Sequence, residues 1–414
     1  MPTSKQMHTL NMVVDQRFKR TPDGRVWTHV PPAYEFFEGA LGVFDRVRII
    51  ARTIDIDRVP ENARAVNGKN VEVVAVPSFV GPLQYLRQRS RVSEALARVA
   101  DLDGAFLLRI PSQTAFVLAS MLSRVGRPYA VELLTDPYEF FAPGVSPNGL
   151  AYLFRPYFCA RSRALCANAV AVNYITGSAT RRANPATHAK SDVSVSDVDL
   201  SEDSFLSLPR PAATSVNSVP IEIVSVGFFD LLYKGQDLLI KALAACEGQG
   251  LNFRLTFVGD GRSRETLMNL AASYGIAHRI RITGALGGAN EVRKYLEAAH
   301  LFTLPSRAEG IPRALLEAMA AGLPAICSSV GAMPDLLDPR WIVQPGSVHQ
   351  LHTKLVEFFQ VPGEWDAIGK RNQDVARRYQ RSEVQPRRME FYRKVQELGH
   401  FSPCSSSAEV FYAA

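Results

Sequence analysis

The sequence predicts an α/β protein made of two doubly wound domains, each built on a parallel β-sheet. Several expected strands are almost continuously apolar, as in residues 71–76 (VEVVAV). Such strands are typical of a parallel sheet that helices cover on both faces. Expected helices alternate with them along the chain, as in an α/β fold. The length of 414 residues suits about two domains of ordinary size.

The composition favours a folded protein in a reducing compartment. Hydrophobic residues make up 47% of the chain and charged residues 21%, which excludes a disordered chain. No apolar run reaches the roughly 18 residues needed to span a bilayer, and residues 1–16 lack the pattern of a secretory signal. The five cysteines form no C-x-x-C pair, which argues against a disulfide framework or a zinc site. We therefore expect a cytoplasmic protein.

The expected boundary between the domains lies near residues 205–220. Residues 191–218 are rich in Ser, Asp and Pro, a composition typical of a linker. A frayed tail is expected at the end of the chain. The expected units are residues 1–205, residues 206–380, a last helix within 381–400 and the tail at 401–414.

The first domain is expected to hold six strands and three helices. The strands are expected at residues 11–14, 46–52, 71–76, 104–110, 129–134 and 169–175, the last of these closing the domain. The helices are expected at residues 34–42, 83–100 and 152–167. Gly24 lies in a turn after the first strand, where a glycine would let the backbone approach a bound phosphate. An ordinary turn explains Gly24 equally well.

Polar side chains follow two strands of the first domain. Arg109 and Ser112 lie at the end of the strand at 104–110, and Asp136 follows the strand at 129–134. Ligands of doubly wound sheets bind beyond the carboxyl ends of the strands. These residues are therefore candidates for ligand binding, although Asp136 would serve equally well as the cap of a turn or helix that begins at Pro137.

The second domain is expected to repeat the same alternation. Its strands are expected at residues 221–226, 253–258, 279–283, 302–304 and 325–327. Its helices are expected at residues 236–245, 291–299, 314–321 and, after the domain, 383–398. Pro312 suits the first position of the third helix, and Gly322 suits its end.

The stretch at residues 305–324 joins a strand, a tight loop and this third helix. A helix that begins just after a strand offers free N–H groups and a positive dipole end to an anion. Glu309 lies in the loop and Glu317 lies eight residues later in the helix. A carboxylate at such a junction can accept hydrogen bonds from two neighbouring hydroxyls.

These residues resemble a known family. The run EGIPRALLEAMAAGLP, from Glu309 to Pro324, resembles the Glu-x7-Glu signature of retaining, family-4-type glycosyltransferases, also called glycosyl transferases group 1. Shorter motifs occur in the family's order, at residues 226–227, 234–235, 258–261, 282–284 and 305–307. The resemblance is strong over residues 221–337 and weaker before them.

The resemblance implies the GT-B fold, in which two Rossmann-like domains face a cleft and a last helix crosses back to the first domain. It also implies transfer of a sugar from a nucleotide-diphosphate sugar with retained configuration, most often in bacterial polysaccharide biosynthesis. The acceptor would be a saccharide or a lipid-linked saccharide. Transfer on a single face of the sugar is favoured, since no residue is marked as a nucleophile.

The resemblance also implies roles for individual residues. Glu309, Lys234 and Asp136 are the expected catalytic residues: Glu309 binds donor-sugar hydroxyls and Lys234 faces the donor diphosphate. The residues expected to bind the donor are Glu317, which would hold the ribose, Gly310, Ile311, Arg307, Gly227, Gly259, Gly284 and Gly24. Arg109 and Ser112 are expected on the acceptor side. If these roles are wrong, we expect Lys234 to be a solvated surface lysine and Glu317 to be an exposed charge on its helix.

Two positions depart from the family pattern. Relatives usually carry an Arg directly after the first glycine of the second domain, where this chain has Phe228. Either one phosphate contact is missing or Arg307 or Arg313 replaces it. Asp136 stands where many relatives carry a histidine near the reacting sugar, which leaves its catalytic role open.

No cofactor or metal is expected. Arg264 occupies the place of the third glycine of a G-x-G-x-x-G motif, and no P-loop motif occurs. Three D-x-D tripeptides are interpreted as surface residues, because such short motifs arise by chance. Two other functions stay open. One is a nucleotide-sugar 2-epimerase of the same fold, and the other is a non-catalytic nucleotide-sugar-binding subunit.

The positive charge is concentrated in the first half of the chain. Residues 1–200 contain 24 Lys and Arg against 18 Asp and Glu, within a net charge of +7 for the whole chain. The helices at 83–100 and 152–167 are basic and amphipathic, and such helices can bind an anionic membrane surface. A solvated helix face is the alternative. The expected partners are the donor, the acceptor and peripherally the membrane, with no nucleic acid.

Overall fold

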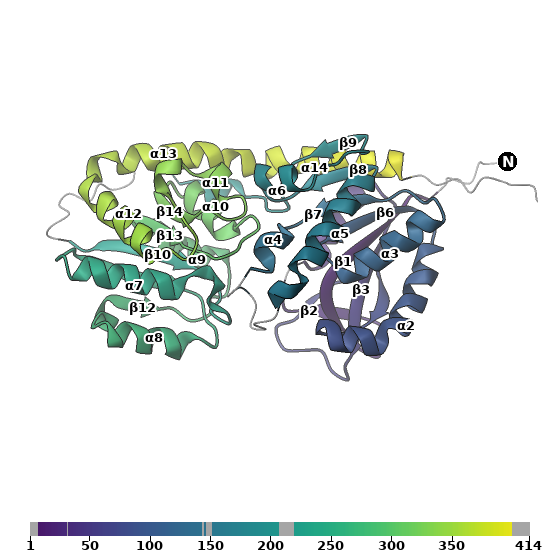
Figure 1. Ribbon diagram of the computed structural model, residues 1–414, viewed down its shortest axis with the longest axis horizontal. Helices are drawn as coiled ribbons and strands as arrows, with labels where there is room; N and C mark the ends of the chain where they lie inside the picture. The colour runs from purple at the N-terminus through teal and green to yellow at the C-terminus, as the bar shows by residue number, and fades with distance from the viewer. Residues whose placement is uncertain (1–6, 31, 143–144, 146–150, 207–218, 400–414) are drawn as a thin grey trace, which may run out of the picture.

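The computed structural model describes residues 7–30, 32–142, 145, 151–206 and 219–399. Two α/β units lie next to each other, each around its own sheet (Figure 1). The α/β class with two parallel-sheet units, as predicted from the sequence, is confirmed. The tail expected at 401–414 and part of the expected linker, at 207–218, lie outside the described residues.

The first sheet is parallel except at one corner. Its parallel strands lie in the order β5-β3-β1-β6-β7-β8-β9, while β2 and β4 add an antiparallel corner beside β1. The strands are β1 (Thr9–Arg20), β2 (Val26–Thr28), β3 (Arg46–Asp55), β4 (Arg64–Ala65), β5 (Val71–Pro77), β6 (Ala105–Ile110), β7 (Ala130–Leu133), β8 (Ala171–Tyr174) and β9 (Ser191–Val193). The order reverses direction between β1 and β6, which is the switch point of a doubly wound sheet.

Helices cover both faces of the first sheet. One face packs against α2 (Gly81–Ala100), α3 (Gln113–Arg124) and α5 (Arg155–Asn168). The other face packs against α1 (Tyr34–Glu38) and against α14 (Arg381–Leu398), the last helix of the chain. Phe391, Tyr392 and Val395 of α14 are buried in this core. The end of the chain therefore stabilises the first domain.

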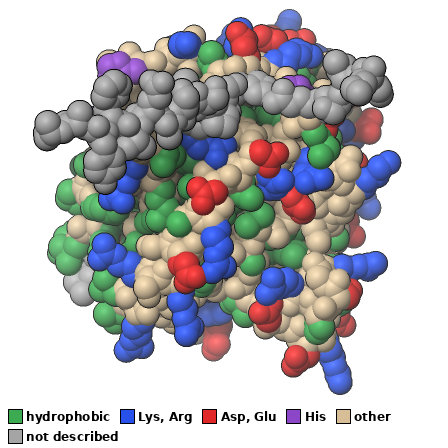
Figure 2. Space-filling view, turned by 90° about the vertical axis from the view of Figure 1, so that its right-hand side faces the viewer, with side chains coloured by type: hydrophobic (Ala, Val, Ile, Leu, Met, Phe, Trp, Pro, Cys, Tyr) green, Lys and Arg blue, Asp and Glu red, His purple; other side chains and the backbone are tan. Residues whose placement is uncertain are grey.

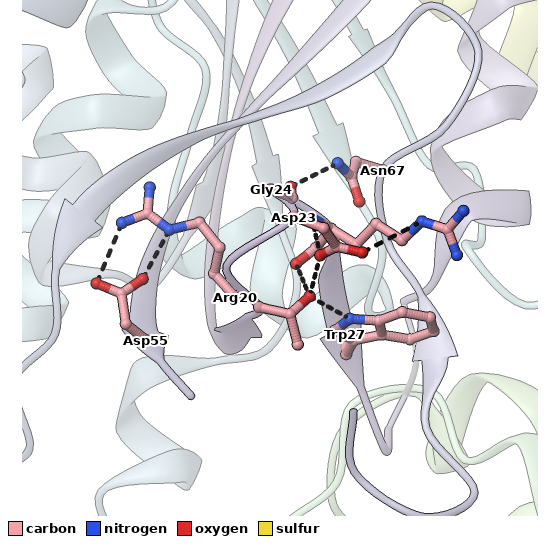
Figure 3. Close-up of polar contacts among 8 residues, drawn as sticks. Arg20, Asp23, Gly24, Trp27, Asp55 and Asn67 are labelled. Carbon is pink, nitrogen blue, oxygen red and sulfur yellow. Dashed lines mark hydrogen bonds and ion pairs between the residues drawn. The ribbon is translucent and has the colours of Figure 1, made fainter. Parts of the chain in front are cut away.

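The first strand is longer than the sequence indicated. A change of register between Val13 and Arg17 allows β1 to continue to Arg20 and turn back as a hairpin into β2. Gly24 lies in the hairpin turn with φ +80°, and its carbonyl accepts a hydrogen bond from Asn67 (Figure 3). Thr21 and Trp27 close the turn through a 3.0 Å hydrogen bond. Gly24 therefore lies in a turn whose backbone conformation favours glycine, and its approach to a bound phosphate stays a prediction.

The linker interpretation of residues 191–218 was wrong at its start. Ser191–Val193 forms β9, which pairs in parallel with β8, so the strand at 169–175 is not the last of the first sheet. A three-residue edge strand of Ser, Asp and Val offers no apolar run from which to predict it. The segment that follows also pairs with the C-terminal region, because Leu200 exchanges backbone hydrogen bonds with Tyr379 and Arg381.

The second sheet is fully parallel, in the order β12-β11-β10-β13-β14-β15. Its strands are β10 (Ile221–Val226), β11 (Phe253–Val258), β12 (Ile280–Ile282), β13 (Leu301–Leu304), β14 (Ala325–Ser328) and β15 (Ile342–Val343). The order reverses between β10 and β13. This sheet therefore has its switch point between these two strands, where a doubly wound sheet binds its ligand.

Helices also cover both faces of the second sheet. One face packs against α7 (Gln236–Glu247), α8 (Arg264–Ser273) and α12 (Val348–Gln360). The other packs against α9 (Ala289–Ala298), α10 (Arg313–Ala320), α11 (Met333–Leu336) and α13 (Trp365–Ala376). None of the helices in the described part of the chain combines the length and the apolar character that a bilayer crossing requires.

Candidate active site

Two loops meet at the switch point of the second sheet. The loop at 227–235 follows β10, and the loop at 305–312 follows β13, its neighbour in the sheet. They touch at Gly235, where a Cβ atom would lie 2.1 Å from the carbonyl oxygen of Pro305. Gly235 also has φ +76°. Only glycine satisfies both conditions, which places Lys234 directly beside the Glu309 loop.

Lys234 and Glu309 form a largely buried ion pair. The Lys234 Nζ lies 2.8 Å from Glu309 Oε1, and the two side chains are 15% and 9% exposed. Ser306 Oγ donates to the same carboxylate at 2.9 Å. Burial by itself would lower the pKa of Lys234, but the charge of Glu309 and the neighbouring Tyr233 outweigh it and raise that pKa. Lys234 is therefore a positive charge at neutral pH, fixed beside a carboxylate.

Arg307 acts as a scaffold for these loops. Its guanidinium binds both carboxylate oxygens of Asp237, at 2.9 and 2.7 Å, and donates to the carbonyl of Leu232 at 2.6 Å. The pair fixes the start of α7 and the Lys234 loop to the loop after β13. Of the two arginines considered as substitutes at Phe228, Arg313 is the more available, since its side chain is 56% exposed. Phe228 is 66% exposed.

The glycines that the sequence marked as donor-binding bring three loops together. A Cβ on Gly259 would lie 2.1 Å from the carbonyl oxygen of Gly227. Gly259 also forms an isolated bridge with Gly284. Glycine at 259 allows the loops after β10, β11 and β12 to approach this closely, so these loops present backbone groups at one end of the sheet.

Glu317 lies in α10 (Arg313–Ala320), the helix that follows the Glu309 loop. Helix α10 begins at Arg313, with Pro312 at the N-cap position and not, as expected, at the first helical position. Glu317 lines a small cavity of about 60 Å³ together with Ser201, Ser204 and Arg293. Burial raises the pKa of Glu317, and Arg313, at 3.9 Å, partly opposes this. A half-buried carboxylate beside hydroxyls and an arginine is not an exposed helix charge.

The acceptor-side candidates have clear structural partners. Arg109, only 3% exposed, pairs with Glu132 and Asp197, each at 2.9 Å. Ser112 caps α3 and donates to Asp15 at 2.9 Å. Both anchor the carboxyl end of β6.

Asp136 caps a short helix. The sequence left two roles open for Asp136, ligand binding and the capping of a helix, and the structure shows the cap. It is the N-cap of α4 (Pro137–Phe140) and accepts a hydrogen bond from the Tyr138 amide at 2.9 Å. An aspartate before a proline is well suited to this role.

A cavity of about 830 Å³ opens between the first domain, α14 and the start of α10. Residues that line it include Glu35, Phe36, Arg109, Asp199, Arg313 and Arg388. Arg109 stacks over the ring of Phe36 with its Cζ 4.7 Å from the centroid. The cavity thus offers aromatic, acidic and basic groups next to the first residue of α10.

Sequence reasoning missed Glu139. Its carboxylate reaches from α4 to the second domain and accepts a hydrogen bond from the Gly331 amide at 2.8 Å. Burial raises the pKa of Glu139 to about 7, with the charges of Asp136 and Glu309 adding to the rise and the Gly331 amide opposing it. The local pattern Asp-x-x-Glu indicates only a helix start, so no sequence signal marked this contact.

Comparison with known proteins shows what the chain is similar to. Residues 220–360, which carry both loops and both glutamates, match the family described as glycosyl transferases group 1. This part of the chain resembles the group 1 glycosyltransferases. The chain is 25% identical over 324 residues to Protein CapJ of Staphylococcus aureus, covering 78% of this chain and 80% of CapJ. It is 31% identical over 158 residues to the amylovoran biosynthesis glycosyltransferase AmsK of Erwinia amylovora, covering 36% of this chain and 38% of AmsK.

Solved structures share the overall fold of this chain. A sucrose-phosphate synthase from Thermosynechococcus elongatus superposes with a TM-score of 0.66 at 16% identity, covering 94% of this chain and 99% of the other. Anabaena HepE in complex with UDP superposes with a TM-score of 0.62 at 17% identity, covering 93% and 99%. The GT-B fold expected from the sequence is confirmed.

The arrangement can stabilise negative charge on a leaving group. Lys234, the exposed Arg313 and the first amides of α10 supply positive charge at the carboxyl end of β13. Within the described residues, no three His, Cys, Asp or Glu side chains come together as metal ligands. A reaction that needs no metal stays a prediction.

Proposed function

We propose that this glycosyltransferase moves a sugar from a nucleotide-diphosphate sugar to a saccharide or lipid-linked saccharide, with retained configuration, in the assembly of a capsule or exopolysaccharide. One observation carries the proposal. The Lys234–Glu309 pair lies at the switch point of the second sheet, beside the N-terminus of α10. The setting is supported by AmsK, which is named for amylovoran biosynthesis.

The proposed donor site uses these groups in turn. Glu309 accepts hydrogen bonds from hydroxyls of the transferred sugar, and Lys234 neutralises charge on the diphosphate. Arg313 supplies the contact that Phe228 cannot make. Glu317 accepts hydrogen bonds from the ribose. The structure of HepE was solved with UDP, which supports UDP as the first nucleotide to test.

The proposed reaction places the positive charge where negative charge develops. When the bond between sugar and phosphate breaks, the diphosphate gains charge that Lys234, Arg313 and the α10 dipole stabilise. The acceptor hydroxyl attacks on the face from which the diphosphate leaves, and its proton passes to the departing phosphate oxygen. No metal and no covalent intermediate take part in this proposal.

The proposed acceptor site is the 830 Å³ cavity. It opens next to Arg313, so an acceptor there would reach the donor across the interdomain cleft. Its carboxylates and guanidinium groups offer acceptors and donors for sugar hydroxyls, and Phe36 offers an apolar ring face. A saccharide fits this mixture of groups.

Nucleotide binding is the first test of the proposal. The wild type and the Glu317→Ala variant are heated with UDP, GDP, ADP, CMP and dTDP. A nucleotide at about 100 times its dissociation constant should stabilise the wild type by roughly 2.7 kcal/mol, and Glu317→Ala should lose that shift. Glu265→Ala, an exposed helix carboxylate of the same domain, is the control and should keep it. No shift in the wild type with any nucleotide would contradict the donor assignment.

Donor consumption separates this function from the alternatives. A transferase consumes the donor sugar only when an acceptor is present. An epimerase converts the donor without an acceptor, and a binding subunit shows the nucleotide shift without consuming donor.

The proposed membrane contact lies at the start of α2. Leu83 and Leu86 are 72% and 63% exposed there, next to the exposed Arg87, Arg89 and Arg91. The end of the molecule seen in Figure 2 shows Lys and Arg spread among Asp and Glu. We assign the proposed membrane contact to the start of α2, because exposed apolar and basic side chains lie together there.

Vesicle sedimentation tests this contact. Wild type should sediment with anionic phosphatidylglycerol vesicles and be released by salt. Reversing two charges in Arg87→Glu/Arg91→Glu should weaken binding at least about tenfold, since each basic residue contributes about 1 kcal/mol. The control Lys370→Glu/Arg378→Glu changes two exposed charges of the C-terminal region. Equal binding of both variants would remove the membrane contact from the proposal.

A further inference from the structure

The start of α11 is held by two contacts from the first domain. Gly331, just before α11, donates its amide to Glu139 of α4 at 2.8 Å. Asp335, within α11, accepts hydrogen bonds from the Ser178 amide and hydroxyl at 2.5 and 2.8 Å. Ser178 begins α6 (Ser178–Ala183). Both contacts cross between the domains.

Gly331 in turn lies directly on the Glu309 loop. A Cβ at this position would lie 2.3 Å from the carbonyl oxygen of Gly310 and 2.5 Å from that of Glu309. Next to it, the Ala332 amide donates to the carbonyl of Gly310 at 3.0 Å. Any shift of the Gly331 peptide therefore moves the backbone of Glu309 as well, because the two segments are in van der Waals contact.

Two charged groups, Asp136 and Glu309, act on Glu139, and the charged groups named from the other neighbouring elements have partners of their own. Asp136 lies on its own helix, and Glu309, paired with Lys234, lies on the facing loop. From α11, Asp335 is engaged with Ser178. From α5, Arg155 stacks over Tyr138, with its Cζ 4.0 Å from the ring centroid. Among the described residues, the Gly331 amide is the one hydrogen-bond donor shown for the Glu139 carboxylate.

We propose that Glu139 is a positioning residue, which couples the approach of the first domain to the placement of the Glu309 loop through Gly331. The proposal rests on the proposed function of Glu309 in donor binding. A carboxylate suits this role because a charged acceptor makes a stronger hydrogen bond to an amide than a neutral one. When the domains separate, the bond breaks, and the Glu309 loop loses its support from the acceptor side.

The contact should also respond to pH. The pKa of Glu139 is raised to about 7, so the group is ionised above this pH and protonated below it. A protonated carboxyl is a weaker acceptor for the Gly331 amide. We therefore expect kcat to fall as the pH drops through about 7 and to level off above it.

Kinetics of three variants test the proposal. Glu139→Ala should lose at least tenfold in kcat across the pH range. Glu139→Gln keeps a carbonyl acceptor, so it should stay within about fivefold of the wild type at pH 8 and lose the fall in kcat below pH 7. Glu94→Gln, an exposed glutamate of α2, should match the wild type. Wild-type kcat in Glu139→Ala, or an unchanged pH profile in Glu139→Gln, would overturn the proposal.

Hydrogen exchange gives a second measurement that does not depend on turnover. The Gly331 amide should exchange at least tenfold faster in Glu139→Ala than in the wild type or Glu94→Gln, with faster exchange also at residues 308–312. Unchanged exchange would overturn the proposal. A failure of the proposed function would show instead as a wild type without donor turnover, which leaves the exchange comparison intact.

Discussion

Replacing Glu309 with glutamine is expected to lower kcat for sugar transfer at least about 100-fold, as loss of a preorganised polar group at a reacting centre typically does. Glutamine keeps the shape of the side chain and can still accept from Ser306, which now bonds the carboxylate at 2.9 Å. It removes the charge that faces Lys234. Steady-state kinetics at saturating donor measure the change, with Glu265→Gln as a matched control on an exposed helix.

The same substitution should change how activity depends on pH. In the wild type the charge of Glu309, together with Tyr233, outweighs burial and holds the pKa of Lys234 above its usual value. Without that charge burial remains, so the pKa of Lys234 falls. The residual activity of Glu309→Gln should therefore decrease at high pH, where Lys234 loses its proton, earlier than in the wild type. Near-normal kcat with an unaltered profile would show that Glu309 has no part in the reaction.

Glu309 also contributes to stability through its partner. Removing one member of a buried ion pair leaves the other charge uncompensated, which costs about 3–5 kcal/mol. Glu309→Ala should therefore lower the free energy of unfolding more than the double variant Glu309→Ala/Lys234→Met does. Circular dichroism and urea unfolding separate this loss from the loss of chemistry.

Replacing Gly235 with alanine is expected to destabilise the protein and to disturb the loop that carries Lys234. Two costs add at this position. The backbone has φ +76°, where alanine pays about 1–2 kcal/mol. The new Cβ would also lie 2.1 Å from the carbonyl oxygen of Pro305, and such overpacking costs about 1–3 kcal/mol.

Gly250 provides a matched control, because its φ is +75° but a Cβ there would meet nothing within 4 Å. Gly250→Ala should lose only the backbone term, about 1 kcal/mol, whereas Gly235→Ala should lose about 3 kcal/mol in total. Gly235→Ala should also lose at least about tenfold in kcat, because the loop that carries Lys234 must move away from the Glu309 loop. Urea unfolding and kinetics of both variants test this. Equal stability losses would mean that the contact with Pro305 relaxes freely.

The two domains have different roles in this arrangement. The second domain holds the expected donor groups within two neighbouring loops and one helix. The first domain contributes Arg109 and the large cavity, together with Glu139 at the domain interface. In the proposed function, sugar transfer depends on how the domains meet, which the variants of Glu139 test directly.

Local patterns were enough to predict the two-sheet α/β class and most helices and strands. Apolar runs marked β3, β5, β10 and β11, because most residues of these strands are buried or partly buried between the helices that cover a parallel sheet. Sequence patterns failed to predict strands whose extent depends on pairing with neighbouring strands. The edge strand β9 lacks an apolar run, and β1 continues past a change of register that only its neighbours determine.

The sequence by itself determined that Lys234 and Glu309 lie in loops and that Glu317 lies in a helix. The apolar runs, glycines and helix-forming residues that indicate these elements are close to them in the chain. Only the tertiary structure decided which charges meet. Lys234 reaches Glu309 across 75 positions, and Glu139 reaches Gly331 across 192. Arg307, expected at the donor, binds Asp237, and its contact with a donor stays a prediction. The order of strands in the sheets and the meeting of the two domains set these contacts, and no periodicity of a single chain segment encodes either.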